Sequence, residues 1–413
     1  MGRGAIVSEI SNETSELKTQ DAIKQDSVVE EISESGGSST SEESFSSQAE
    51  IIRQWISLIK GSCDVRVGSA AIVSMGDVMR GSVTTTRRSL LLVEEGSPAE
   101  LVEETRRELT DAGFVVARYD LPTNTKRSIA SVNLLVEALA QACITSDDLI
   151  CAVGSSTLMS LAAYVSTNWC GATELCCVPC NLFAATSGLI TPLGLDVAGK
   201  EELIRFAGKA KHAFIDFDFL TADLSCESAM HMRALMVQSA LADSERSFST
   251  LWDRADDIVT GDLPTLSLQI VDTLKSRGNL VAATSAAVRQ SVDHGSIFVR
   301  ALKTLLPANV PESTLLAESM RFASRLAAAQ SDFAIDDVLA VDELLEKLEL
   351  PLLQATVDPD QMIAALKAIS FERSSRFLLG LPRSLGRVRL ANVDEDLLKE
   401  HVSAWCAVHR VEE

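Results

Sequence analysis

The stretch that decides the fold runs from Leu149 to Leu195, LICAVGSSTLMSLAAYVSTNWCGATELCCVPCNLFAATSGLITPLGL, and carries one charged residue, Glu174. Its order of apolar run, Gly154-Ser155-Ser156 turn, helical pattern and second apolar run predicts strand, turn, helix and strand. Continuous apolar strands are typical of parallel sheets that helices cover on both faces. The turn lies where α/β nucleotide enzymes grip a cofactor phosphate, but it has a single glycine.

From the N-terminal side up to the start of this stretch, short apolar runs alternate with longer helical patterns. The expected strands are Ala70–Val73, Ser89–Val93, Phe114–Tyr119 and Leu149–Val153, and the expected helices are Ile51–Ile59, Pro98–Ala112 and Ser128–Ala142. Strands that alternate with helices indicate right-handed βαβ units and a parallel sheet.

On the C-terminal side, beyond about residue 206, the pattern changes to long amphipathic helices. They are expected at Ser228–Ala242, Leu263–Arg277, Ser296–Leu306, Glu312–Ala329 and Asp358–Ile369. The prediction is an α/β fold, with a Rossmann-like parallel-sheet domain over residues 49–205 and an all-helical C-terminal domain over residues 206–413. Because ligands of open α/β sheets bind beyond the carboxyl ends of the strands, the expected site is the cleft between the two domains.

Composition narrows the class of protein. Residues 1–48 are rich in Ser and Glu, with few basic residues, which predicts a disordered acidic tail. The net charge of −21 disfavours nucleic acid and anionic membranes as partners. Nine scattered cysteines, without a secretory signal, predict a reducing compartment and hence a cytoplasmic protein.

Two alternatives arise from the uncharged stretch itself. Leu149–Thr173 and Leu175–Leu195 are each long enough to span a bilayer, although their Ser, Thr and Asn content and the flanking Asp residues favour buried strands. Cys177-Val178-Pro179-Cys180 has the C-x-x-C spacing of redox and zinc sites. Because the pair begins on an expected strand rather than at a helix start, buried packing cysteines are the favoured interpretation.

Three strings resemble one enzyme family. Gly199–Phe206 is similar to G-K-N-x-I-G-x-F, Ile215–Leu220 with Glu227 to D-x-x-x-L followed by R-E, and Arg376–Gly380 through Asp394 to a closing I-R-F-V-L-L…I-G…V-D pattern. In this order they resemble 3-dehydroquinate synthase over about residues 69–402. The resemblance implies a shikimate-pathway lyase of aromatic amino acid biosynthesis that uses NAD and a divalent metal, Zn or Co, to cyclise a seven-carbon phosphate.

The cofactor positions implied by the resemblance are altered. Where the family has G-G-G-V-V-x-D, this chain has Gly154-Ser155-Ser156-Thr157-Leu158-Met159-Ser160, so Cβ atoms occupy space that glycines leave free. A later Asp and Lys of the family become Ser187 and Leu193. If nucleotide binding persists, the candidate contacts are Gly154, Ser155, Ser156, Lys126 and Asn181.

The metal and phosphate positions are altered as well. The family's three metal ligands fall on Ala234, Ser296 and Glu312, and a second family His falls on Arg300. Methyl and hydroxymethyl groups cannot replace the donors that zinc or cobalt requires. A relocated metal site is the alternative, formed by His231, His294 and Glu312. The D-K-K string is reduced to Phe371-Glu372-Arg373, which leaves Lys200 as the candidate phosphate contact.

Two functions follow from these substitutions. The first is a catalytically impaired homologue, a pseudoenzyme that acts by binding or regulation, as a homodimer or paired with an active synthase. The second is an active 3-dehydroquinate synthase with relocated metal ligands.

Overall fold

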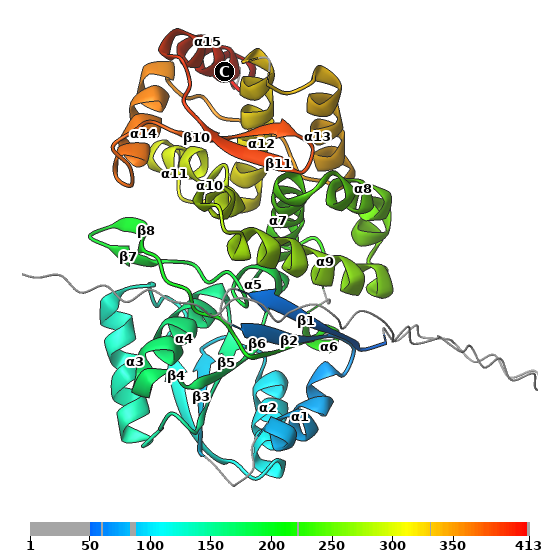
Figure 1. Cartoon of the computed structure of the whole chain (residues 1–413), viewed down its shortest axis with the longest axis vertical. Coiled ribbons are helices and arrows are strands. Elements are labelled where there is room, and N and C mark those ends of the chain that lie inside the picture. The colour runs from blue at the N-terminus through cyan, green and yellow to red at the C-terminus, as the bar shows by residue number, and fades with distance from the viewer. Residues whose placement is uncertain (1–49, 59–60, 83–87, 221–222, 331, 411–413) are drawn as a thin grey trace, which may run out of the picture. The chain divides into compact units, whose positions relative to one another are not determined.

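A seven-stranded sheet lies in the N-terminal half of the chain, with the strand order β1-β2-β9-β6-β5-β3-β4 (Figure 1). The computed structural model describes residues 50–58, 61–82, 88–220, 223–330 and 332–410, so the predicted tail lies outside the described residues. The antiparallel pair is β1 (Ile52–Leu58) and β2 (Gly61–Gly68). The parallel strands that complete the sheet are β3 (Arg88–Glu94), β4 (Val115–Leu121), β5 (Leu149–Gly154), β6 (Glu174–Pro179) and β9 (His212–Asp216).

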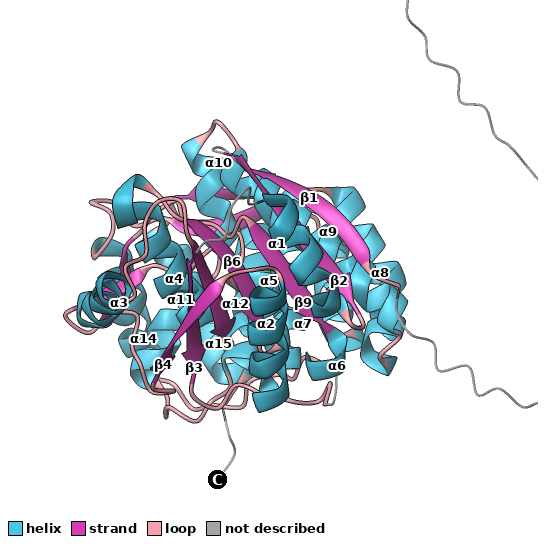
Figure 2. Ribbon diagram, turned by 90° about the horizontal axis from the view of Figure 1, so that it is seen from below, coloured by secondary structure: helices cyan, strands magenta, loops and turns pink. Residues whose placement is uncertain are grey.

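Helices cover both faces of this sheet (Figure 2). On β3, Leu91 and Val93 pack with helices α1 (Met75–Ser82) and α2 (Ala99–Asp111). Their neighbours Leu90 and Leu92 pack on the other face with α3 (Ile129–Gln141) and α4 (Ser156–Asn168). Because successive side chains of a strand point to opposite faces, such a doubly covered strand must be apolar throughout, as the sequence indicates.

The predicted helix at Ile51–Ile59 is wrong, since Ile52–Leu58 forms strand β1 at the edge of the sheet. Ile56 is buried, and it lies close to Gly278 of α9 (Leu263–Ala282), whereas Arg53 and Trp55 are exposed. The segment therefore alternates between two faces, and pairing with β2 outweighs its helical pattern.

The predicted strand at Ala70–Val73 is also wrong, because the chain forms a 3₁₀ turn, η1 (Ala71–Ser74). The backbone N–H of Ile72 donates to the Asp216 carboxylate at 3.0 Å, and that of Ala70 donates to Asp218 at 3.1 Å. These side-chain acceptors satisfy the backbone donors that a sheet partner would otherwise satisfy.

The membrane alternative is overturned by the fold of the uncharged stretch. Leu149–Leu195 supplies β5, α4, β6 and the short helix α5 (Leu182–Ser187), and both strands lie inside the parallel sheet. No helix among the described residues has the length and apolar character needed to cross a bilayer.

The α/β fold class is confirmed, and the C-terminal region is mainly helical. The expectation of an all-helical domain over residues 206–413 is wrong, because strands β9, β10 (Leu379–Ser384) and β11 (Arg387–Ala391) lie within it. In addition to α9, the region's longer helices are α7 (Glu227–Asp243), α8 (Glu245–Thr260), α11 (Ser296–Leu305), α12 (Glu312–Ala329), α13 (Ile335–Lys347), α14 (Pro359–Phe371) and α15 (Glu395–Val408). Strands β10 and β11 form an antiparallel pair. The sheet itself continues past residue 205, because β9 lies between β2 and β6.

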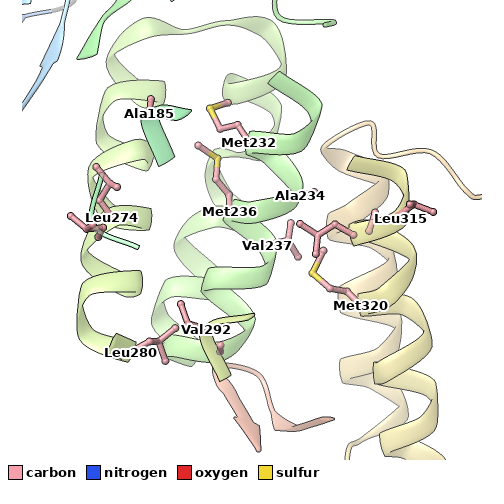
Figure 3. Close-up of a cluster of buried hydrophobic side chains, with 14 of the residues drawn as sticks. Ala185, Met232, Ala234, Met236, Val237, Leu274, Leu280, Val292, Leu315 and Met320 are labelled. Atoms are coloured by element: carbon pink, nitrogen blue, oxygen red, sulfur yellow. The ribbon is translucent and has the colours of Figure 1, made fainter. Parts of the chain in front are cut away.

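Helix α7 is the centre of the helical region. Met232, Met236 and Val237 of α7 lie among side chains of α9, such as Leu274, and of α12, such as Met320 (Figure 3). A helix that is apolar on all sides is stable only when neighbours surround it. Its burial fixes α7, α9 and α12 relative to one another, and side chains from all three reach the site described below.

A small hairpin stands apart from the main sheet in Figure 1. It consists of β7 (Leu195–Val197) and β8 (Lys200–Ile204), joined at Ala198 and Gly199, which both have positive φ. Two consecutive residues with positive φ are typical of the tight turns that join hairpin strands. The register shifts between Leu195 and Val197, and within β8 the residue Glu202 has φ 52°, a backbone conformation that non-glycine residues rarely adopt.

Candidate functional site: an ion-paired cavity

A cavity of about 540 Å³ lies beyond the carboxyl ends of the parallel strands, facing helices α7, α11 and α12. The residues that line it after β4, β5 and β6 include Lys126, Ser156, Thr157 and Phe183. Its charged lining comprises Lys126, Arg127, Arg277, Arg300 and Lys303 with Asp196, Glu201, Glu202, Glu227, Asp293 and Glu312. The cavity therefore lies where an open α/β sheet places its ligand.

At the N-terminus of α4 the candidate phosphate turn already holds a carboxylate. The backbone N–H of Ser155 donates to Glu94 Oε2 at 2.6 Å, and the Ser155 hydroxyl accepts a hydrogen bond from the backbone N–H of Thr157 at 3.3 Å. A Cβ at Gly154 would lie 2.8 Å from Glu94 Cβ, so glycine is needed here to make room for Glu94. A pyrophosphate at this helix end would meet a like charge, and these residues do not fit the phosphates of NAD.

Only some of the candidate cofactor contacts line the cavity. Lys126 and Ser156 line the cavity, whereas Gly154, Ser155 and Asn181 are not among its lining residues. Asn181 precedes α5, and its side-chain oxygen accepts from the backbone N–H of Ala184 at 2.9 Å. Its amide is therefore used as a helix cap.

The positions that resemble the family's metal ligands do not form a metal site. Ala234 is fully buried in the core of α7, and the Ser296 hydroxyl accepts a hydrogen bond from Arg300 Nη1 at 3.3 Å. Glu312 is paired with Lys303, whose Nζ lies 2.5 Å from Oε1. In the part of the chain that the structure describes, no three His, Cys, Asp or Glu side chains form a group that could hold a metal ion. The donors do not fit zinc or cobalt.

The relocated site is not assembled either, which corrects that expectation. His231 and Glu312 both line the cavity, but His294 does not. His294 Nε2 lies 3.0 Å from the Gln238 carbonyl oxygen, and the Gln238 amide in turn donates to the His294 carbonyl oxygen at 2.7 Å. These reciprocal hydrogen bonds hold His294 away from His231 and Glu312.

His231 is a neutral aromatic group in this cavity. Its ring stacks on Phe183, with centroids 3.7 Å apart and planes inclined by 15°. Burial lowers the pKa of His231 to about 4, against which the nearby Glu312 charge acts only in part. At neutral pH the pair therefore offers an uncharged stacking platform on one wall.

A partly buried ion-pair network around Asp293 and Arg277 forms another part of the cavity lining. Burial raises the pKa of Asp293, but the charges of Arg205 and Arg277 lower it. The net pKa lies below its ordinary value, so the carboxylate stays ionised. Arg205 Nη1 lies 2.7 Å from Asp293, and Arg277 Nε donates to the Thr191 hydroxyl at 2.9 Å. The sequence reasoning missed Arg277, Asp293 and Lys303, because no motif marks them.

Lys200, the candidate phosphate contact, does not line the cavity. Its Nζ lies 3.0 Å from Glu372 at the end of α14. The charge is therefore engaged with a carboxylate.

The cysteine cluster fits the packing interpretation. Cys151, Cys176 and Cys177 are fully buried on adjacent strands. A hydrogen bond with Cys151 that favours the protonated thiol, together with burial, raises the pKa of Cys176 well above its ordinary value, and burial raises that of Cys180 to about 11. Thiols with such pKa values are protonated at neutral pH and are poor nucleophiles.

Comparison with known sequences gives one consistent family. No family model matches the chain. It is similar to 3-dehydroquinate synthase from Symbiobacterium thermophilum, 22% identical over 311 residues that cover 72% of this chain and 85% of the relative. It is also similar to 3-dehydroquinate synthase from Streptococcus pneumoniae, 20% identical over 368 residues that cover 82% of this chain and 96% of the relative.

Solved structures share the fold. A 2-deoxy-scyllo-inosose synthase complexed with carbaglucose-6-phosphate, NAD⁺ and Co²⁺ has a TM-score of 0.73 at 15% identity, covering 85% of this chain and 99% of that one. ValA, a 2-epi-5-epi-valiolone synthase from Streptomyces hygroscopicus with NAD⁺ and Zn²⁺ bound, has a TM-score of 0.71 at 17% identity, covering 85% and 98%. The chain is therefore related, at low sequence identity, to the 3-dehydroquinate synthase family, as its sequence strings predict.

Proposed function

We propose that this protein is a catalytically silent relative of 3-dehydroquinate synthase that acts by binding, in connection with the shikimate pathway. The observation that carries the proposal is the replacement of metal donors. Ala234 and Ser296 stand at two of the three ligand positions, and the third, Glu312, is paired with Lys303. Without three donors, a divalent ion cannot be held in the geometry that Lewis-acid chemistry requires.

The nucleotide end of the cavity supports the same proposal. Two of the structural neighbours hold NAD⁺ together with Co²⁺ or Zn²⁺. In this chain Glu94 accepts a hydrogen bond from the N–H of Ser155, at the helix end where a nucleotide phosphate would need backbone donors. Loss of both cofactor sites leaves the cavity as a binding site, lined by charged side chains and the Phe183–His231 stack.

The test is phosphate release from the family's seven-carbon phosphate substrate, with the full chain supplied with NAD⁺ and with CoCl₂ or ZnCl₂. A 3-dehydroquinate synthase assayed in parallel is the positive control. We expect release at the rate of the protein-free blank. Turnover above that blank, together with stoichiometric metal in the purified protein, would show that the chain is an active synthase.

We further propose that the protein is cytoplasmic and works either as a homodimer or in a complex with an active synthase. Sedimentation of the purified chain, alone and mixed with a 3-dehydroquinate synthase, separates these assemblies by mass. A monomer in both samples would refute the proposed assembly without bearing on catalysis.

A further inference from the structure

Helix α11 presents a stripe of three polar side chains to the cavity. Ser296, Arg300 and Lys303 all line it, and their spacing of four and three residues places them on one face of the helix. Ser296 is a former metal-ligand position by resemblance. Arg300 and Lys303, which follow it on this face, are cations, so positive charge lies next to a position that the resemblance assigns to a metal ligand.

Arg300 and Lys303 form ion pairs with carboxylates from two other parts of the chain. The Arg300 side chain is only 8% exposed, and its Nη2 lies 3.2 Å from Glu202 while its Nε lies 3.6 Å from Glu201. Lys303 Nζ lies 3.3 Å from Glu201 and also pairs with Glu312. Both glutamates of the hairpin and the first residue of α12 thus meet at one face of α11.

The backbone conformation of the hairpin places the Glu202 side chain beside Arg300. Glu202 has φ 52°, and its N–H donates to the Asp196 carboxylate at 2.9 Å. Gly194 lies opposite, where a Cβ would approach Glu202 Cβ to 2.9 Å. A non-glycine residue in the left-handed region costs free energy and persists only where surrounding contacts hold it, which points to the ion pair with Arg300 as the compensating contact.

Two more arginines tie the same hairpin to the helical region. Arg373, beyond the end of α14, donates from Nη2 to the carbonyl oxygen of Glu201, and Arg205 at the end of the hairpin pairs with Asp293. We propose that these protein cations, with Arg300 at the centre, clamp the β7–β8 hairpin against α11, α12 and α14, so that the cavity is assembled without metal.

The clamp rests on the proposed metal-free function and extends it. A divalent ion placed among Ser296, Glu201, Glu202 and Glu312 would lie at short range from two cations, Arg300 and Lys303, and like charges repel. The ion would have to displace the guanidinium and the ammonium to reach the carboxylates.

Hydrogen–deuterium exchange of the full chain measures the clamp directly, in peptides that cover residues 195–204. We expect wild-type exchange in these peptides to be the same with EDTA and with excess CoCl₂ or ZnCl₂. Arg300→Ala should speed exchange there by roughly tenfold, because it removes the more buried and closer of the two arginines that pair with Glu202. Arg300→Lys, which keeps the charge but not the fork of donors, should give a smaller increase.

Lys275→Ala is the matched control, because Lys275 forms an exposed ion pair with Asp272 on α9 and should leave hairpin exchange unchanged. If Arg300→Ala does not fold, Glu202→Gln removes the same pair from the hairpin side and should again speed exchange. Wild-type exchange rates in the folded Arg300 or Glu202 variants, or slowing by Co²⁺ or Zn²⁺ that EDTA reverses, would overturn the clamp. Phosphate release by the wild-type chain would instead defeat the proposed function, so the two failures are distinguishable.

Discussion

Glu318 of α12 is a carboxylate inside the core that pairs with Arg321 of the same helix and with Trp405 and His409 at the end of α15. His409 Nε2 lies 2.9 Å from Glu318 Oε1, and Trp405 Nε1 donates to the same oxygen at 2.8 Å. Burial lowers the pKa of His409, but the hydrogen bond and the charge of Glu318 raise it. The raising effects outweigh the effect of burial, so the pKa of His409 lies above its ordinary value. Conversely, burial raises the pKa of Glu318, but His409, Trp405 and Arg321 together bring it below its ordinary value, so each member of the Glu318–His409 pair favours the charged form of the other.

Because the pKa of His409 is raised on folding, its contribution to stability is complete below its ordinary pKa and is lost as pH rises through the raised value. Glu318, with a lowered pKa, contributes above its ordinary pKa and loses this as pH falls through the lowered value. His409→Gln should therefore reduce the free energy of unfolding by about 1–2 kcal/mol near pH 6 and by much less near pH 9. Urea unfolding at the two pH values measures the difference.

His401→Gln is the control on the same helix, since burial lowers the pKa of His401 and its charged form therefore adds no stability to the folded state. Its cost should not decrease toward pH 9. An equal cost of His409→Gln at pH 6 and pH 9 would contradict the charged pair and indicate packing alone.

At the scale of elements, the edge strand β1 is held against α9 by a close approach at Gly278. A Cβ at this position would lie 2.8 Å from Ile56 Cγ2 and 3.4 Å from the Ser57 carbonyl oxygen. Glycine in a helix interior is unfavourable by about 1 kcal/mol relative to alanine, so its presence here indicates that the packing distance matters more.

Gly278→Ala tests which effect is larger. The helix gains about 1 kcal/mol in propensity, but forcing a methyl group into the contact with Ile56 costs about 1–3 kcal/mol. We expect a net decrease in the free energy of unfolding, measured by urea denaturation.

Gly81→Ala in α1 is the matched substitution, because no heavy atom lies within 4 Å of the added Cβ. It should be neutral or stabilising by up to about 1 kcal/mol. If both variants are stabilised alike, then β1 does not depend on the close approach to α9.

At the scale of the whole molecule, a protein that has lost both cofactor sites should not be stabilised by the cofactors. A ligand present at one hundred times its dissociation constant adds about 2.7 kcal/mol to the free energy of unfolding of any protein that binds it only when folded. For a large domain that corresponds to a rise of several degrees in melting temperature.

We expect the melting temperature of this chain to be the same with and without NAD⁺ and CoCl₂, added singly or together. A 3-dehydroquinate synthase under identical conditions should show the rise. A matching rise here would mean that Glu94 and the Arg300 network are displaced on binding, and it would reopen the question of catalysis.

Local pattern alone determined much of this protein. The apolar runs of β3 and β5 and the long helical patterns of α7 and α12 predict their elements, because burial on a sheet or helix face imposes a period on nearby residues. The substitutions at Gly154–Ser160 and at Ser296 were also readable, since each concerns the chemistry of single residues in a recognisable string.

Tertiary structure decided the rest, for a common physical reason. Segment Ile52–Leu58 forms strand β1 because it pairs with β2 and packs against α9. The His294 ring is held by the Gln238 carbonyl group of α7. Lys303 and its partner Glu201 are 102 residues apart. Such contacts join segments that the fold alone brings together, and a linear pattern holds no record of them. By resemblance, the sequence thus indicates which metal-ligand positions carry other residues, whereas only the folded chain shows which charges lie beside them.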